Sequence, residues 1–444
     1  MPMSFEKHYF PNRWIKTKDQ QEHSYFQDHG TEDHENHKEG RLTKQAILLL
    51  AVHGLFAAAN ALSGTFVNVY LWKVSNDLSL IGWFSLSHQV VNILTFWLAG
   101  KWVKEHNKMN SLRLGVGLSA VFYLFVLLLQ KQAVDYVLIL GAVQGMAAGF
   151  FWLAFNVVYF EITGPHDRDK FNGYAGLLGS GAGMFAPWIS GIVITQMKAT
   201  SGYKIIFSIS LIVFVIGVIV SFFLKKREPK GTYQWFDAFQ RLKEKNNPWR
   251  RTFLALMAQG MREGVFAFII GLLVYIATRN EMKLGNFSLI VSAVALVSYM
   301  FIGKYLKPWN RNRAMFIGTI FMIVVIFPFF WDINYTTLLI FGIGTSIFLP
   351  LFTIPMTSTV FDIIGKDNES AQQRVEYVVL REAGLNAGRI LGTLIFILII
   401  TWSNKPIVLN VFLLCIGSSP LLAWYYMRNL MPTKSNKTIN IKQK

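Results

Sequence analysis

Cysteine is almost absent from this chain of 444 residues, since Cys415 is the single one and lies inside an apolar run. One thiol can form neither a disulfide within the chain nor a cluster of cysteine ligands around a metal. Catalytic motifs are missing as well: the sequence has no Gly-rich phosphate loop ending in Lys-Ser/Thr, no HExxH and no G-x-S-x-G. We therefore predict that the protein is not an enzyme, has no ATP motor and needs no cofactor or metal.

Charged residues are scarce too. They make up 15% of the chain, whereas a soluble domain carries roughly 25%. The sequence is instead 53% hydrophobic, and apolar runs of about 20 residues, long enough to cross a bilayer, recur along it. This pattern predicts an all-α polytopic membrane protein. We expect twelve transmembrane helices, at residues 45–72, 79–103, 110–130, 134–163, 172–198, 203–225, 252–278, 284–306, 313–331, 335–364, 376–401 and 405–428.

Acidic residues are in the minority, and the net charge is +18. In a soluble protein this excess would suggest a nucleic acid partner, but the placement of the bases suggests otherwise. The loops after the odd-numbered helices hold only seven of the 43 Lys and Arg: Lys73, Lys131, Lys198, Lys204, Arg279, Lys283 and Lys405. Because cytoplasmic loops retain Lys and Arg, we expect a multi-pass protein of the cell membrane with both termini in the cytoplasm and no nucleic acid partner.

Three polar segments flank or divide the helices. Residues 1–44 hold five of the nine histidines among acidic residues, and their irregular spacing favours a disordered cytoplasmic tail over metal capture. Residues 226–251 form a basic linker in which aromatic and aliphatic side chains fall at helical spacing, which predicts an amphipathic helix on the membrane surface. A solvated tether is the alternative for that linker. Residues 429–444 are expected to be a second cytoplasmic tail.

Two stretches 203 residues apart resemble each other closely: GKWVKEHNK at 100–108 and GKYLKPWNR at 303–311. The similarity continues in order, with IGWFSL and LGNFSL, FEITG and FDIIG, and GSGAG and GLNAG at nearly the same offset. Six spans fall in each half, so the halves have parallel topology about an axis along the membrane normal. We therefore predict two six-helix bundles, at 45–225 and 252–428.

Twelve helices, a parallel repeat, a long basic central loop and a Gly-plus-base loop after helices 2 and 8 resemble the major facilitator superfamily, and within it poorly characterised permeases of Gram-positive bacteria. The resemblance covers residues 45–430. The family's loop reads loosely G-x-x-x-D-R/K-x-G-R/K-R/K; here Gly100 and Gly303 match its first position, and Lys108 and Arg311 match its later bases. Lys104 and Lys307 stand where the family has the Asp that latches its inner gate.

The resemblance implies a monomeric secondary transporter in which two bundles rock about a site at the membrane midplane. The two loops would then belong to the inner gate. Glu161 and Asp362 recur at the inner ends of helices 4 and 10, and their symmetry indicates that they pair with bases of these loops.

Helices 7 and 11 of the second half carry Arg and Glu residues well inside their spans, and the matching positions of helices 1 and 5 are uncharged. Helix 7 carries Gln259, Arg262 and Glu263, and helix 11 carries Arg381, Glu382, Asn386 and Arg389. A charge at mid-membrane is costly and rarely lacks a partner or a wet cavity. One interpretation is that an Arg holds an anionic group of the solute while Glu263 or Glu382 carries a coupling proton. The other is that these residues form internal salt bridges that hold the bundle and gate together.

Helix 1 presents a fainter polar stripe that includes His53 and Asn60 and is typical of a cavity lining. Glycines 384, 388 and 392 on helix 11, and 179 and 183 on helix 5, are expected to serve close helix packing.

Together these features predict a secondary active transporter that moves a small organic solute, driven by protons, within a lipid bilayer. A protein of the same shape that senses or scaffolds without transporting is the alternative, because the latch loop is altered and the first tail is long and charged.

Overall fold

The computed structural model describes residues 42–163, 168–197, 201–226, 231–245, 247–364, 373–403 and 405–432. The predictions for the histidine-rich first tail and for nearly all of the last tail lie outside these residues.

Long helices make up almost all of the described chain. The first half contains α2 (Lys44–Ser75), α3 (Leu78–Glu105), α4 (Lys108–Leu129), α5 (Val137–Ile162), α6 (Arg168–Gln196) and α7 (Ser201–Ser221). The second half contains α9 (Pro248–Thr278), α10 (Glu281–Tyr305), α11 (Arg311–Val324), α12 (Tyr335–Ile364), α14 (Arg374–Trp402), α15 (Pro406–Gly417) and α16 (Pro420–Met427). Short 3₁₀ turns lie at Gln130–Val134, Pro308–Asn310 and Phe327–Phe330.

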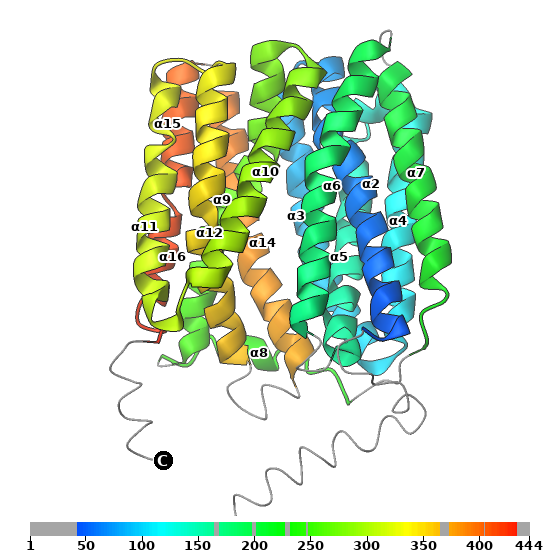
Figure 1. Cartoon of the computed structure of the whole chain (residues 1–444), viewed down its shortest axis with the longest axis vertical. Coiled ribbons are helices and arrows are strands. Elements are labelled where there is room, and N and C mark those ends of the chain that lie inside the picture. The colour runs from blue at the N-terminus through cyan, green and yellow to red at the C-terminus, as the bar shows by residue number, and fades with distance from the viewer. Residues whose placement is uncertain are drawn as a thin grey trace, which may run out of the picture.

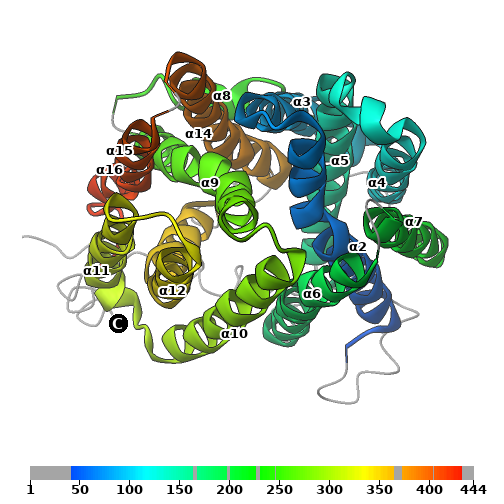
Figure 2. The same cartoon turned by 90° about the horizontal axis from the view of Figure 1, so that it is seen from above.

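The helices form two bundles side by side, α2 to α7 and α9 to α16, as Figures 1 and 2 show. All twelve predicted spans coincide with helical stretches, although the last is divided into α15 and α16 at Ser418 and Ser419. Eleven helical stretches among the described residues are long and apolar enough to cross a membrane. The remaining long helix, α3, is more polar and packs at the junction of the two bundles.

Polar residues mark where the helices begin. Asp77, Asn107 and Asn247 each accept a backbone N–H with the side chain at the N-cap of α3, α4 and α9, which satisfies a donor that the helix leaves free. The repeat extends to the far ends of α2 and α9, where Asn76 and Arg279 both adopt the left-handed conformation, with φ of 53° and 49°. The two halves therefore share turn geometry as well as sequence.

The first and last described residues lie at one end of the molecule, the bottom in Figure 1; we call it the tail end and the opposite one the distal end. Two helix pairs make most of the contact between the bundles. The pair α3 and α14 is in contact along its length, from Gly82 against Ile397 near the distal end to Lys104 against Glu376 at the tail end.

The second pair, α6 and α10, touches only in its distal half. There Ser292 donates a hydrogen bond to the Gly183 carbonyl at 3.1 Å, and Gly191 packs against the backbone of Glu281. Toward the tail end the two helices separate, and a Cβ added at Gly176 or Gly303 would meet no atom of the described residues within 4 Å. The tail end is thus closed along one junction and parted along the other.

Glycines bring α9 and α14 close together, as the ladder on helix 11 predicts. A Cβ at Gly388 would lie 1.9 Å from the Met257 carbonyl oxygen, and one at Gly392 would lie 2.6 Å from that of Met261. The corresponding prediction for helix 5 is wrong, because the atoms nearest to a Cβ at Gly179 and Gly183 are 4.0 and 3.9 Å away.

The described part of the central linker does not contain the extended amphipathic helix that its spacing predicts. Between residues 231 and 245 it forms one helix of four residues, α8 (Asp237–Gln240), and residues 248–251 already belong to α9. The aromatic side chains pack on protein instead: the Trp235 ring lies 5.0 Å from that of Trp97 on α3. Tertiary contacts with α3 override the local periodicity here.

Candidate functional site

An ion pair between α9 and α14 forms the centre of the polar cluster. Arg389 donates to Glu263 at 3.0 Å, and Gln259 donates to the other carboxylate oxygen of Glu263 at 2.7 Å. Both charged side chains keep accessible surface, 28% for Arg389 and 36% for Glu263. The predicted meeting of polar faces on helices 7 and 11 is confirmed at this pair.

This cluster extends across the junction into the first bundle. Asn386 donates to Asn92 on α3 at 3.1 Å and also accepts a hydrogen bond of 3.4 Å from Arg389. A continuous hydrogen-bonded path therefore runs from Glu263 in one bundle to Asn92 in the other. The ion pair is thus connected through Asn386 to the contact between the bundles.

Arg262 is not part of this path. Its guanidinium lies 4.7 Å from the centre of the Phe266 ring on its own helix, and Phe266 packs on Phe341 of α12. Its Nε and one terminal nitrogen are buried without a hydrogen-bond partner among the described residues. Arg262 thus lies inside the second bundle and not at the junction.

Arg381 and Glu382 form a separate pair on α14, with 2.5 Å between nitrogen and oxygen. The Arg381 guanidinium lies 5.8 Å from the ring of Phe361, near the tail end of α12. Neighbouring residues on one helix satisfy each other here, so this pair does not bridge two helices as Arg389 and Glu263 do.

The predicted lining of helix 1 is only partly accessible. His53 is buried, with its ring stacked on that of Phe155 at 4.8 Å between centroids, and its Nδ1 has no hydrogen-bond partner among the described residues. Asn60 donates to the Phe56 carbonyl of its own helix at 3.0 Å. Asn60 thus has a partner on its own helix, and within the described residues neither side chain is hydrogen-bonded to the cluster around Glu263.

The two repeated loops make equivalent ion pairs inside their own bundles. Lys108 pairs with Glu161, and Arg311 pairs with Asp362 at 2.5 Å. The sequence prediction that Glu161 and Asp362 pair with loop bases is confirmed.

Lys104 makes a contact of a different kind, because its partner belongs to the other bundle. Its Nζ donates to Glu376 at the start of α14 at 2.5 Å. The two residues are 7% and 2% exposed. The linker contributes as well: the Gln234 N–H donates to the same oxygen of Glu376 at 3.1 Å.

The linker also closes over Gly100. A Cβ at Gly100 would lie 2.6 Å from the Tyr233 ring, so this position needs glycine. Burial and the nearby Glu376 carboxylate raise the pKa of the Tyr233 phenol, which therefore stays neutral beside the ion pair. In the second half no described atom covers Gly303, and Lys307 lies beside Trp309.

A second ion pair between the bundles lies at the distal end. Lys73 on α2 donates to Glu281 on α10 at 2.8 Å, and the Tyr203 hydroxyl donates to the same carboxylate oxygen at 2.9 Å. Glu281 is buried at this junction. The distal end is thus held closed by a carboxylate of one bundle inserted against the other.

Sequence comparison places the protein among known relatives. The Major Facilitator Superfamily matches residues 49–368. The chain belongs to this family. An uncharacterised protein of Bacillus subtilis (strain 168), YqgE, is 39% identical over 389 residues, which is 88% of this chain and 90% of that protein.

Solved transporters share the fold of this superfamily member. It resembles a mutant of the nucleoside transporter NupG with a TM-score of 0.67 and 15% identity over 86% of this chain and 99% of the other. It resembles a D-xylose-proton symporter with a TM-score of 0.65 and 12% identity over 86% and 97%. The chain is therefore a multi-pass membrane protein of a transporter family.

The sequence did not reveal either of the acids that join the bundles. Neither Glu376 nor Glu281 has an acidic counterpart in the first half of the repeat. They lie 272 and 208 residues from their lysine partners. A signal did exist for Glu376. Lys104 replaces the superfamily's Asp, and a reversed charge at that position calls for an acid opposite it.

Proposed function

We propose that the protein is a secondary active transporter that moves a small organic solute across the cell membrane by alternating access, coupled to protons at Glu263. The observation that carries this proposal is the partly accessible ion pair of Arg389 and Glu263, linked through Asn386 to the other bundle. The bundles of residues 45–225 and 252–428 are the moving units, joined by the linker 226–251.

The coupling follows from the chemistry of the pair. Glu263 as a carboxylate neutralises Arg389 and accepts its hydrogen bond. When Glu263 takes up a proton it loses its charge, and Arg389, which stays protonated at any physiological pH, is left to bind another anion. A carboxylate or phosphate group of the solute fits that role, because guanidinium binds both through two parallel hydrogen bonds. Proton uptake and solute binding thus favour each other.

The orientation belongs to the same proposal. The scarcity of bases in the distal loops supports a tail end that faces the cytoplasm. The parted ends of α6 and α10 would then admit solute from the cytoplasm, while Lys73 and Glu281 close the outer side. A single chain contains both bundles, so we propose that the monomer is the working unit.

Proton coupling also has a precedent among similar structures, since one of them is a D-xylose-proton symporter. One of the two arguments for a transport-inactive sensor or scaffold was that the loop has lost the superfamily's Asp. That argument is weakened, because Lys104 and Glu376 supply an ion pair between the bundles at the same place.

The test uses purified protein in liposomes that contain a pH-sensitive dye, with pools of organic anions, amino acids, sugars and lipophilic cations added outside. Wild type should give a pH change that depends on one pool. Glu263→Gln should lose that change while still exchanging labelled solute across the membrane. Glu382→Gln is the matched control, since it removes the acid of the other α14 pair, and it should retain the pH change.

Two results would contradict the proposal. A pH change retained by Glu263→Gln would remove this residue from coupling and leave transport standing. Absence of labelled flux with every pool, from protein that elutes as a single folded species, would instead favour the sensor or scaffold.

A further inference from the structure

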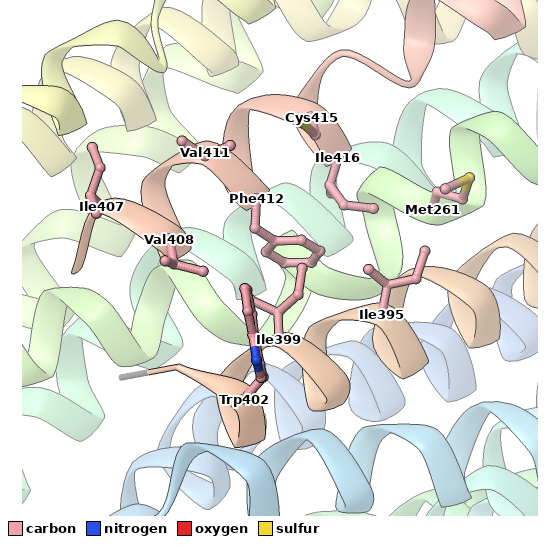
Figure 3. A pocket seen from close by; sticks show the side chains of 10 residues that line it. All are labelled: Met261, Ile395, Ile399, Trp402, Ile407, Val408, Val411, Phe412, Cys415 and Ile416. Carbon is pink, nitrogen blue, oxygen red and sulfur yellow. The ribbon is translucent and has the colours of Figure 1, made fainter. Parts of the chain in front are cut away.

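An apolar groove of about 480 Å³ lies between α14 and α15, away from the ion pairs, with Met261 of α9 at one end (Figure 3). The side chains of Ile395, Ile399 and Trp402 line it from α14, and Val411 lines it from α15. No polar cluster described above opens into it, so the groove is not part of the proposed solute site.

The length and position of this groove match one leaflet of a bilayer. Its α14 residues lie within the last eight positions of the helix, from Ile395 to Trp402, which at 1.5 Å per residue extend about 10 Å inward from the distal end. One leaflet supplies about half of a hydrocarbon core of about 30 Å. The groove therefore runs from the distal membrane surface toward the midplane.

Its rim is exposed on the outside of the bundle. Trp402 is 82% exposed, and Val411 is 47% exposed. Both belong to membrane-spanning helices, so the medium that meets this surface is lipid. An indole at a helix end is also typical of the membrane interface.

One cation lies in the sequence between two residues that line the groove, Trp402 and Ile407. Lys405 directly precedes α15 and is the only charged residue in the sequence between Arg389 and Arg428. We propose that the groove binds one acyl chain of a phospholipid from the distal leaflet and that Lys405 binds its phosphate, so that anionic phospholipids are preferred. The bound chain fills the space between α14 and α15 and supports the helix that carries Arg389.

The first test is native mass spectrometry of the full chain released from membranes of phosphatidylglycerol and phosphatidylcholine with identical acyl chains. Wild type should retain one lipid with a preference for phosphatidylglycerol. Val411→Trp, which fills the groove, should lose it. Leu398→Trp, at an exposed position of α14 outside the groove, should retain it. Lys405→Gln should keep a lipid but lower the headgroup preference about fivefold, the effect of one lysine at an anionic surface.

A second measurement needs no variant, because the single cysteine of the chain, Cys415, lines the groove. Phosphatidylglycerol added to delipidated protein should slow the alkylation of Cys415 by a membrane-soluble maleimide, and phosphatidylcholine should slow it less. Equal lipid retention by Val411→Trp and Leu398→Trp, or an alkylation rate that lipid leaves unchanged, would overturn the proposal. So would a dimer mass without lipid, which would assign the groove to a second copy of the chain.

Discussion

At the scale of single residues, the ion pair that joins the bundles at the tail end is almost completely removed from water. Lys104 and Glu376 are 7% and 2% exposed. Burying one of these charges alone is expensive, whereas here Lys104 and the Gln234 N–H both donate to one carboxylate oxygen of Glu376. Lys104 and Glu376 therefore form an ion pair between the bundles at the loop position where the superfamily has an Asp, with the charge of the loop residue reversed.

A double-mutant cycle tests this interpretation. Glu376→Gln keeps an acceptor for the Gln234 N–H but leaves Lys104 unpaired, so each single variant, Lys104→Met or Glu376→Gln, should unfold at a lower temperature. The double variant should recover part of the loss, with a coupling free energy of about 0.5–3 kcal/mol. The same cycle on the exposed pair Arg241 and Glu244 should give no more than about 0.5 kcal/mol. Equal coupling in both cycles would show that burial adds nothing at the latch.

At the scale of helices, glycine positions differ in how closely the neighbouring helix packs against them. Gly388 and Gly392 put the backbones of α9 and α14 in direct contact, with the Arg389 and Glu263 ion pair beside them. Glycines at corresponding places on α6 meet nothing closer than about 4 Å. The contact between α9 and α14 is therefore a fixed joint within one bundle, while α6 has room to approach a neighbour.

Alanine substitution separates the two cases. Gly388→Ala should lower the free energy of unfolding by about 1–3 kcal/mol, because its methyl group would overlap the Met257 carbonyl. Gly183→Ala, the matched change on α6, should leave stability nearly unaltered. Thermal unfolding in detergent measures both, and a similar loss in the two variants would contradict the packing described here.

Much of this arrangement was predictable, and the exceptions share a physical cause. The long apolar runs determine the helices, and a feature that occurs twice, such as Glu161 and Asp362 with their bases, can be inferred from the repeat. The cost of a mid-membrane charge was enough to predict a polar site on helices 7 and 11. Features that depend on one tertiary contact were not accessible: the side of α9 on which Arg262 lies, and the turn of the linker onto Trp97.

At the scale of the whole molecule, the asymmetry of the tail end predicts how the bundles move. The junction of α3 and α14 is held by ion pair, amide contact and linker, while α6 and α10 have separated. If the bundles move about a fixed α3–α14 edge, the distance that changes most is the one between the tail-end parts of α6 and α10.

Spin-label distances measure this motion directly. In a Cys415→Ser background, labels at Tyr174 on α6 and Met300 on α10, both exposed, should approach each other when solute and protons are supplied. Labels at the exposed Leu98 on α3 and Leu391 on α14 should keep their separation. Equal changes in both pairs would indicate symmetric rocking, and no change in either would indicate a static scaffold.

The route of the linker has a further consequence. Residues 233–236 cross from one bundle to the other along α3 and α14, beside the edge that stays shut. Because the linker crosses at the edge about which the bundles move, the length of this crossing does not have to change when the opposite edge opens. The residues on either side of that crossing are thus free to vary in length, or even to be severed, without limiting how far the two halves swing.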